Sequence, residues 1–392
     1  MRRPPVRILF VNEKCGFFGG VEQNIAETAA GLRLRGHHCA LAWKELTGRD
    51  VPAFQANFDE CVTVFPLSKA VEIFRPDVIY IHKAQVGELG DFPPDLRVVR
   101  MVHDHDLCCP RRHKYYAWNG RVCHHKADWR CYLDAAFIGR APDSRKLEFI
   151  SIEKKMVEMR RNQKLDLLLV GSNSMRQELT QNGFDQQRVA VLAPVVRIPA
   201  RQMPPIPAEN RILYVGQLIH GKGVDLLIRA LPHIRCDYEL TIVGTGNGQA
   251  VLEDLCRSLG ITDKVRFAGW VSPTQIGDFY AAAKVIAIPS RWPEPFGMVG
   301  LEAMHYGRPV VGFNTGGIPD WLEHGVTGLL VQEQDIIALA QALEQMLTDP
   351  DRCLLYGRQA QERVRERFCF EGYLDQLQEH LLGHVPERVE PK

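Results

Sequence analysis

The sequence predicts an α/β fold with two doubly wound, parallel-sheet domains that face a central cleft. Three observations support this fold class. Short apolar runs alternate with helical patterns along the chain, a proline-rich segment interrupts the alternation near the middle, and the same alternation then starts again. The length of 392 residues suits two domains of average size.

In the first half of the chain, six apolar runs are candidate strands. They lack polar alternation, which is typical of strands buried on both faces of a parallel sheet. After the first run, Val21, Ile25 and Leu32 recur at helical spacing, and Gly36 ends the pattern. The candidate strands cover residues 6–11, 38–43, 77–82, 98–103, 165–171 and 189–194. Helices between buried strands indicate a doubly wound sheet.

The connector between the two domains is rich in proline. Residues 194–210 contain five prolines, which remove hydrogen-bond donors and disfavour helix. Five more apolar runs follow, at residues 211–216, 238–244, 265–269, 285–290 and 309–313. We therefore predict an N-terminal domain, a linker, a C-terminal domain and a final helix with a tail, at residues 1–200, 201–210, 211–370 and 371–392. Ligands of such sheets bind beyond the carboxyl ends of the strands, so the cleft is the expected site.

The composition disfavours several classes of protein. A net charge of +1 gives no overall field for nucleic acid. No apolar run reaches the roughly 20 residues that span a bilayer, and the N-terminus lacks the apolar region and cleavage site of a signal peptide. The eleven cysteines are an odd number and mostly scattered singly, which favours reduced thiols over a disulfide framework. We expect a cytoplasmic protein.

The most specific stretch of the sequence covers residues 289–320, which begin at the end of a candidate strand. Glu294 and Glu302 are eight positions apart, and a helical pattern starts near Gly297 between them. A loop that leads into a helix offers backbone N–H groups to a phosphate, and carboxylates can bind sugar hydroxyls. The alternative is a capped surface helix with ordinary glutamates.

Residues 289–331 resemble the carboxylate signature of the family 4 retaining glycosyltransferases, the glycosyl transferases group 1 type. Five further segments resemble motifs of that family in the same order: GFFGGVE (16–22), VHDHD (102–106), YVGQLIHGKGVDLLIRAL (214–231), IVGTGNG (242–248) and VRFAGWV (265–271). Each of these motifs is weak alone, but the ordered set is specific and covers both domains. The resemblance implies the two-domain GT-B fold.

The resemblance also implies roles for the matching residues. His103 and Glu294 would act at the donor sugar, and Lys222 would neutralise the diphosphate as charge builds on the leaving nucleotide. The residues implied in donor binding are Gly19, Gly20, Gln217, Lys222, Gly244, Trp270, Val271, Phe296, Gly297, Met298 and Glu302. The bland alternatives are a strand-to-helix turn for the glycine pair, a buried histidine bonded to a carbonyl for His103, and core packing for Trp270.

One position departs from the family pattern. The family usually has arginine directly after the strand glycine, five residues before the lysine, and this chain has Gln217. Glutamine supplies neither the charge nor the fork of donors that arginine has. Either Lys222 carries more of the stabilisation, or a cation of the amino domain compensates, or the donor is atypical, or the activity is degraded.

The function implied is retaining transfer of a sugar from a nucleotide sugar to a hydroxyl of a saccharide or lipid-linked acceptor, in cell-surface polysaccharide or glycoconjugate biosynthesis. No other cofactor and no catalytic metal is required, because positioning and charge stabilisation carry the reaction. The alternatives are a catalytically weakened sugar-binding or scaffold subunit, a nucleotide-sugar epimerase, and a zinc-dependent hydrolase built on residues 103–131.

Residues 102–131 combine four cysteines and five histidines with basic and aromatic side chains. Because they follow a strand at the cleft, we expect acceptor contacts from Arg111, Arg112, Tyr115 and Trp118, which suit an anionic saccharide or lipid phosphate; a solvated basic loop is the alternative. For Cys109, Cys123 and Cys131 the alternatives are structural zinc, free thiols and a disulfide.

Residues 145–164 follow as a basic helical pattern, which either lies on anionic membrane at the cytosolic face or is a surface helix of the amino domain.

Overall fold

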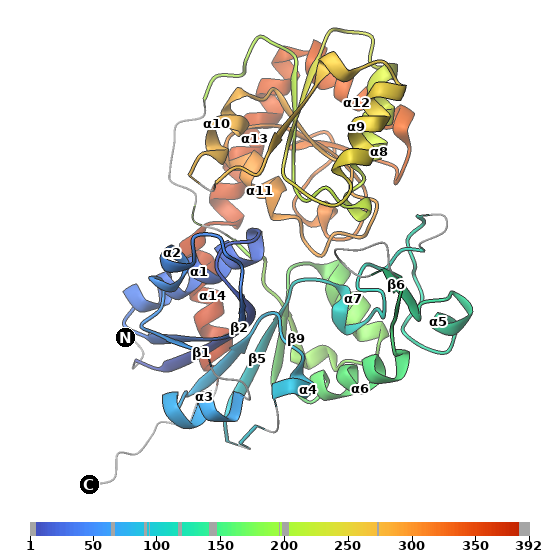
Figure 1. Cartoon of the computed structure of the whole chain (residues 1–392). Coiled ribbons are helices and arrows are strands. Elements are labelled where there is room, and N and C mark those ends of the chain that lie inside the picture. Colours follow the sequence, from blue (N-terminus) through green and yellow to red (C-terminus); the bar gives the residue numbers. More distant parts are fainter. Residues whose placement is uncertain are drawn as a thin grey trace.

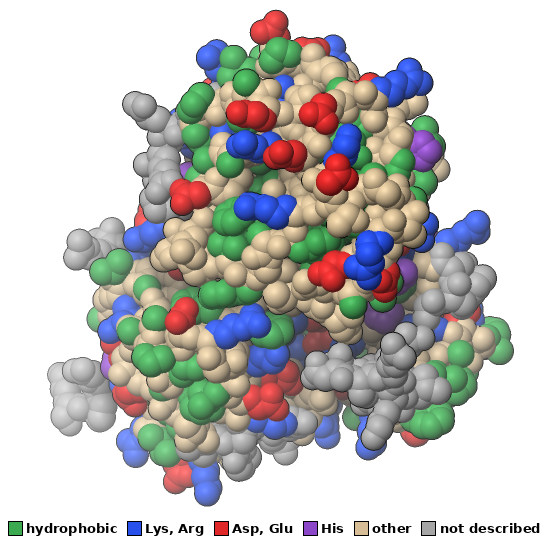
Figure 2. Space-filling model, turned by 45° about the horizontal axis from the view of Figure 1, so that its top comes forward, with side chains coloured by type: hydrophobic (Ala, Val, Ile, Leu, Met, Phe, Trp, Pro, Cys, Tyr) green, Lys and Arg blue, Asp and Glu red, His purple; other side chains and the backbone are tan. Residues whose placement is uncertain are grey.

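Two domains lie one above the other, each with a parallel sheet between helices (Figure 1). The structure is a computed structural model that describes residues 5–63, 67–89, 92–93, 95–116, 120–140, 147–195, 197, 204–272 and 274–383. Charged side chains of both signs are spread over the visible face of both domains, in keeping with the small net charge (Figure 2). The predicted α/β fold with two parallel-sheet domains is confirmed.

The N-terminal sheet has seven strands in the order β3-β2-β1-β4-β5-β8-β9, and neighbouring strands run parallel. The strands are β1 (Arg7–Cys15), β2 (His38–Leu46), β3 (Glu60–Val62), β4 (Val78–Ile81), β5 (Arg97–Val102), β8 (Leu167–Val170) and β9 (Val189–Val191). The six predicted strands are all present. The sequence did not predict β3, because its three residues form no apolar run.

The helices of this domain pack apolar side chains against both faces of the sheet. They are α1 (Gly20–Leu34), α2 (Val51–Gln55), α3 (Leu67–Phe74), α4 (Val86–Leu89), α6 (Ile152–Asn162) and α7 (Asn173–Gln181), with a short 3-10 turn η2 (Gln186–Arg188). In α1, Ile25, Ala29 and Leu32 are fully buried, which is the face that the helical spacing predicts.

Between β5 and α6, the described residues of the stretch 103–150 form an insertion at the side of the N-terminal domain (Figure 1). The insertion contains a 3-10 turn η1 (His105–Leu107), a short helix α5 (Arg130–Leu133) and an antiparallel pair of strands, β6 (Ile138–Arg140) and β7 (Leu147–Phe149). The predicted Cys/His-rich basic loop is therefore the first part of a longer unit that has some secondary structure of its own.

The C-terminal sheet has six parallel strands in the order β12-β11-β10-β13-β14-β15. They are β10 (Arg211–Val215), β11 (Glu239–Val243), β12 (Val265–Gly269), β13 (Val285–Ile288), β14 (Val310–Phe313) and β15 (Gly328–Val331). The helices are α8 (Val224–Ala230), α9 (Gln249–Ser258), α10 (Ile276–Ala282), α11 (Met298–His305), α12 (Ile336–Thr348) and α13 (Pro350–Arg367), with 3-10 turns η3 (His220–Lys222), η4 (Leu231–His233), η5 (Thr262–Lys264) and η6 (Ile318–Asp320).

The last helix, α14 (Phe370–Leu382), crosses back to the N-terminal domain and packs against α1 (Figure 1). The Tyr373 hydroxyl lies 3.2 Å from the Thr28 hydroxyl of α1. Buried apolar side chains form one cluster from Ile25 of α1 and Leu374 of α14 to Phe296 beside α11. The two domains thus share a packed junction in addition to the connector.

Each sheet has its first strand in the interior, where the strand order reverses direction along the chain. In the N-terminal sheet β1 lies between β2 and β4, and in the C-terminal sheet β10 lies between β11 and β13. Ligands of open α/β sheets bind at such switch points, beyond the carboxyl ends of the strands. The glycine turn after β1 and the η3 turn after β10 therefore mark the place where a site is expected.

Candidate active site

The glycine turn after β1 meets the C-terminal domain at the first residue of α11. The Gly19 N–H donates to Glu22 Oε2 at 3.0 Å, and α1 begins at Gly20. A Cβ on Gly20 would lie 2.3 Å from Met298 Cε, whereas a Cβ on Gly19 would have no atom closer than 3.9 Å. A side chain at position 20, where the domains approach each other, would therefore require the flexible end of Met298 to move.

Lys222 and Glu294 form a charged pair at the site. The Lys222 Nζ lies 2.7 Å from Glu294 Oε1, and the Ser290 hydroxyl also bonds to this carboxylate. Burial alone would raise the pKa of Glu294, which is 4% exposed, but the Lys222 ammonium and the hydrogen bonds lower this pKa below its ordinary value. The carboxylate is therefore ionised at neutral pH.

The lysine is held in place by the turn that carries it. A Cβ on Gly223, which has φ 66°, would lie 1.9 Å from the Pro289 carbonyl oxygen, so only glycine allows η3 to approach the end of β13 this closely. Arg291 donates to the His220 carbonyl at 2.6 Å and forms two hydrogen bonds with Asp225. These contacts tie η3 to the glutamate loop.

Glu302 differs from Glu294 in its partners. Its Oε2 accepts a hydrogen bond from the Tyr280 hydroxyl at 2.7 Å. Burial raises the pKa of Glu302 to about 7; the bond from Tyr280 opposes this rise, and the negative charge of Glu27, on α1 of the other domain, adds to it. At neutral pH Glu302 is therefore close to half protonated, while Glu294 is ionised.

The loop between Glu294 and α11 is fixed by donors of the N-terminal domain. The His105 Nε2 bonds to the Pro293 carbonyl at 2.7 Å, and the Ser172 hydroxyl donates to the Pro295 carbonyl at 2.6 Å. The Phe296 side chain is buried against Gly171. Phe296, which the resemblance assigns to donor binding, thus has its side chain packed at the junction between the domains. Gly297, assigned to the same role, precedes α11 with φ 92°.

Gly244, which the resemblance assigns to donor binding, lies at a strand end beside the strand-end Gly269. A Cβ on Gly244, which has φ 135°, would lie 1.9 Å from the Gly216 carbonyl oxygen, and the Gly244 N–H donates to Gly269 at 2.8 Å. The next residue, Trp270, is 41% exposed, so the core-packing alternative is wrong. The Arg49 guanidinium of the N-terminal domain lies 5.5 Å from the Trp270 ring centroid, at cation–π distance.

Val271 and Gln217 complete the predicted donor residues. Val271 is partly buried and packs against the cluster at the junction. Gln217 is exposed, and its carbonyl accepts the Tyr214 hydroxyl at 3.0 Å. Burial raises the pKa of Tyr214, and the charge of Glu294 raises it further.

His103 follows β5 and bonds within its own domain. Its Nε2 lies 2.8 Å from His82 Nδ1, so the expected alternative of a bond to a carbonyl is replaced by a histidine pair. Burial lowers the pKa of His103 to about 3, and the charge of Lys83 lowers it further. The imidazole is neutral at physiological pH. The adjacent Asp104 accepts from Lys83 Nζ at 2.8 Å.

Several of these partners were not predicted from the sequence. His82 ends the candidate strand at 77–82 and Lys83 follows it, so their place at a strand end was a usable signal. Tyr280, Ser172 and His105 are ordinary residue types in helix, cap and loop positions, and only the folded chain brings them to the glutamates and the loop.

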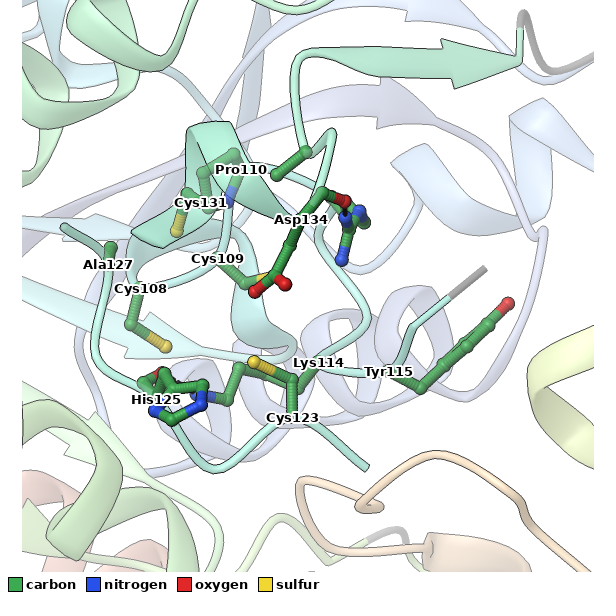
Figure 3. Close-up of a pocket in the computed structure, with 12 residues that line it drawn as sticks. Cys108, Cys109, Pro110, Lys114, Tyr115, Cys123, His125, Ala127, Cys131 and Asp134 are labelled. Carbon is green, nitrogen blue, oxygen red and sulfur yellow. Dashed lines mark hydrogen bonds between the residues drawn. The ribbon is translucent and has the colours of Figure 1, made fainter. Parts of the chain in front are cut away.

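The cysteines of the insertion line a small pocket (Figure 3). The Lys114 ammonium lies there, 2% exposed, donating to the His125 carbonyl at 2.6 Å and pairing with Glu178 Oε1 at 2.8 Å. The lining includes Cys108, Cys109, Cys123 and Cys131. Within the described parts of the chain, no group of three or more His, Cys, Asp or Glu side chains is placed to hold a metal ion.

The zinc hypothesis for Cys109, Cys123 and Cys131 is therefore not supported. A buried ammonium among the thiols repels a second cation, and all eleven cysteines, each in a described segment, are free. Burial raises the pKa of Cys109 and Cys131, so these thiols are protonated. These cysteines form no disulfide bond either, so of the three alternatives the free thiols are the one that holds.

The predicted acceptor residues have different surroundings. Arg111 donates to the Asp134 carbonyl within the insertion, and Arg112 is exposed with φ 68°. The Tyr115 ring lies 5.7 Å from the His220 ring, so this tyrosine contacts the η3 turn of the donor side. Trp118 lies outside the described residues.

Comparison with known proteins bears on the C-terminal half. Residues 199–363 match the protein family described as glycosyl transferases group 1. These residues form a glycosyl transferases group 1 domain. The domain contains Lys222, Glu294 and Glu302, so the paired lysine and both glutamates lie within the matched region.

Two relatives with glycosyltransferase names match different shares of the chain. The chain is 41% identical over 166 residues to an uncharacterized glycosyltransferase of Methanocaldococcus jannaschii. This match covers 42% of this chain and 42% of that protein, so the chain spans less than half of that relative. It is 27% identical over 385 residues, 92% of this chain and 82% of the relative, to D-inositol 3-phosphate glycosyltransferase of Corynebacterium urealyticum.

The fold has a counterpart of nearly equal extent. The crystal structure of HepE of Anabaena in complex with UDP and glucose matches with a TM-score of 0.74 and 21% identity, and the match covers 96% of this chain and 99% of that chain. The predicted GT-B arrangement, in which the glycosyl transferases group 1 domain is the C-terminal half, is thereby confirmed.

Proposed function

We propose that this protein is a retaining glycosyltransferase that moves a sugar from a nucleotide-sugar donor to a hydroxyl of a saccharide or lipid-linked acceptor. The observation that carries the proposal is the Lys222–Glu294 pair, 2.7 Å apart, at the carboxyl end of the sheet in a glycosyl transferases group 1 domain. A role in cell-surface polysaccharide or glycoconjugate biosynthesis belongs to the same proposal, with a place at the cytosolic side of the membrane. Within the described residues, no helix has both the length and the apolar character for a membrane span.

The geometry supports a division of labour between the two domains. Lys222 supplies positive charge for the departing diphosphate, and the backbone N–H groups at the start of α11 supply further donors. The ionised Glu294 accepts hydrogen bonds from sugar hydroxyls, and Glu302 takes the ribose hydroxyls. Neutral His103 donates or accepts one hydrogen bond at the sugar, and its low pKa rules out a role as a proton donor near neutral pH.

Because no side chain is assigned as a covalent nucleophile, positioning carries the reaction. In this proposal the acceptor hydroxyl approaches on the face from which the nucleotide diphosphate departs, and the diphosphate oxygen takes the acceptor proton. The protein stabilises the charge on the leaving group and holds the two substrates in contact. No cofactor beyond the nucleotide sugar takes part.

The test is a thermal-shift series with UDP-, GDP-, ADP- and dTDP-sugars on the purified full chain. A donor that binds only the native state raises the melting temperature in proportion to the logarithm of its concentration. We expect a shift with one nucleotide class, lost in Lys222→Ala and Glu302→Ala. Release of free nucleotide only when an acceptor is present would then establish transfer.

Two other functions lead to different results. A catalytically weakened sugar-binding or scaffold subunit, which the exposed Gln217 favours, binds the donor without turnover. A nucleotide-sugar epimerase converts the donor without any acceptor. Nucleotide release that does not depend on the acceptor would contradict the transferase proposal.

Donor affinity is expected to depend on the ionisation of Glu302. Since its pKa is about 7, and ribose hydroxyls donate to the carboxylate, the Kd of the donor should rise about tenfold per pH unit below 7. Titration calorimetry between pH 5.5 and 8.5 measures this slope. The Glu302→Gln variant should bind more weakly at pH 8 but show no slope, and a slope that survives in the variant would assign the titration elsewhere.

The same shift affects stability with the opposite sign. The native pKa of Glu302 lies above that of an unfolded glutamate, so the protonated form stabilises the fold fully below pH 4.5, and this contribution is lost as the pH rises through 7. The difference in unfolding free energy between wild type and Glu302→Gln should therefore change between pH 5 and 8.

The approach of Gly20 to Met298 provides a test of domain contact. Alanine at position 20 would push against Met298 Cε, and displacing the donor site by a fraction of an ångström should lower kcat/KM about five- to tenfold. The double variant Gly20→Ala/Met298→Ala should recover most of this loss, because the obstructing methyl group is gone. Gly19→Ala, where space is open, is the matched control; an equal loss there would show that the turn, and not the contact, matters.

A further inference from the structure

Exposed apolar side chains gather on the insertion. Trp129 is 67% exposed, Leu133 is 75% exposed and Phe149 is 80% exposed, and Tyr132 and Ile138 are also exposed. We call these five side chains the apolar tip. They come from a stretch of only 21 residues, whereas the other exposed large apolar residues are scattered over the described parts of both domains. Such a group is more than the scattered exposure that is normal for a protein surface.

The apolar tip is one structural unit. Trp129 immediately precedes α5, which carries Tyr132 and Leu133, and Ile138 of β6 pairs with Phe149 of β7. Backbone hydrogen bonds tie the helix to the strand pair, from the Ala136 N–H to the Cys131 carbonyl and from the Ile138 N–H to the Ala135 carbonyl. The unit projects at the outer side of the N-terminal domain (Figure 1), and hydrophobic side chains are visible at that edge in Figure 2.

The same part of the chain holds a local excess of positive charge. Residues 111–150, which precede α6, carry nine Lys and Arg against four Asp and Glu, although the whole chain has a net charge of only +1. Lys126, three residues before Trp129 in the chain, is exposed to solvent. Tryptophan, tyrosine, phenylalanine and leucine next to lysine and arginine are the residue types that bind the interface of an anionic bilayer.

We propose that the apolar tip docks this protein on an anionic lipid bilayer. The charge excess complements acidic headgroups, while the aromatic and aliphatic side chains enter the boundary between headgroups and acyl chains.

The opposite side of the insertion faces the cleft. There Tyr115 lies against His220, and the Gln334 amide donates to the Gly120 carbonyl at 2.9 Å. One unit thus spans from the outer surface to the donor side. If the proposed function holds, on which this consequence rests, docking places a lipid-linked acceptor beside the donor site.

This location differs from the basic helix that the sequence suggested. Helix α6 buries Ile152 and Met159 against the N-terminal domain, so its apolar face is already covered, and α6 is a surface helix of that domain. The candidate membrane surface therefore lies before α6, on α5 and the β6–β7 pair.

Vesicle co-sedimentation of the full chain tests the proposal. Wild-type protein is mixed with phosphatidylcholine vesicles that contain or lack 30% phosphatidylglycerol. We expect sedimentation with the anionic vesicles, at least tenfold weaker for Leu133→Ser/Phe149→Ser. The matched control, Val251→Ser/Leu355→Ser, replaces two exposed apolar residues of the C-terminal domain and should bind like wild type. Because all four residues are exposed, the variants should keep the wild-type melting temperature.

Three results would overturn the proposal. The first is that wild-type protein binds neither kind of vesicle, and the second is that the control variant loses as much vesicle binding as the tip variant. The third is a wild-type dimer in sedimentation velocity that the tip variant abolishes, which would assign the tip to a second copy of the chain. Thermal shift with the nucleotide sugar is measured on the same samples. A shift without vesicle binding would refute only the docking surface, and vesicle binding without a shift would refute only the donor proposal.

Discussion

Replacing Lys222 by methionine is expected to lower kcat of sugar transfer by about 10²- to 10³-fold, the loss typical of one group that stabilises a developing anion. The Lys222 ammonium is the charge nearest to Glu294 at the donor site, and Gln217 adds none beside it. KM for the donor should change less than kcat, because charge on the diphosphate grows as the bond to the sugar breaks. Initial rates of nucleotide release measure both constants.

The same variant is expected to lose stability, which must be separated from catalysis. Without Lys222, the Glu294 carboxylate stays buried and loses its charged partner, although the Ser290 hydroxyl still donates to it, and removing one partner of a buried pair costs about 3–5 kcal/mol. The double variant Lys222→Met/Glu294→Gln leaves no uncompensated charge and should recover most of the unfolding free energy. It should not recover activity. Full recovery of activity would contradict the role of Lys222 in charge stabilisation.

The pH dependence of this stabilisation follows from the direction of the pKa shift. The native pKa of Glu294 is lowered below its ordinary value, so its contribution to stability is present above the pKa of an unfolded glutamate and is lost as the pH falls through the native pKa. Urea unfolding of wild type and of Lys222→Met should therefore converge in acid and diverge above about pH 5.

Local patterns predicted the fold because its strands are buried on both faces. Runs such as residues 77–82 and 285–290 contain enough apolar residues to be read without any knowledge of their neighbours. Lys222 and Glu294 are 72 positions apart, and no periodicity relates them. Their pairing could be anticipated only from the resemblance of their two motifs to one family.

The sequence did not predict the contacts that depend on how the two domains meet. The bonds from His105 and Ser172 to the carbonyls beside Glu294 join residues more than 120 positions apart, and the donors are of common types. The sequence left the state of the cysteine cluster open between zinc, free thiols and a disulfide for a similar reason. The spacing of the thiols permits a metal site, but the position of Lys114 among them, which opposes a cation, is set by Glu178 on α7.

Gln217 is the position at which the sequence departs from the family that it resembles, and the structure allows this departure to be tested by restoring arginine. The side chain is exposed, and the Gln217 backbone is held by the bond from the Tyr214 hydroxyl to its carbonyl. A longer side chain therefore fits without a change in the core. The guanidinium of an arginine at position 217 would add a second cation after Gly216, on the same turn as Lys222.

If the missing charge limits the reaction, Gln217→Arg should raise kcat about 10- to 100-fold, because an arginine forms two charge-assisted bonds to a phosphate. For the same reason, adding Gln217→Arg to Lys222→Met should restore part of the kcat that the lysine variant loses. Gln217→Met, which removes the amide without adding charge, should lower kcat only slightly. The result that would contradict this view is a lower kcat/KM in Gln217→Arg with donor binding kept. Glutamine would then make a specific contact to an atypical donor. With an ordinary nucleotide-diphosphate sugar, the added positive charge would stabilise the leaving diphosphate and could not impair sugar transfer.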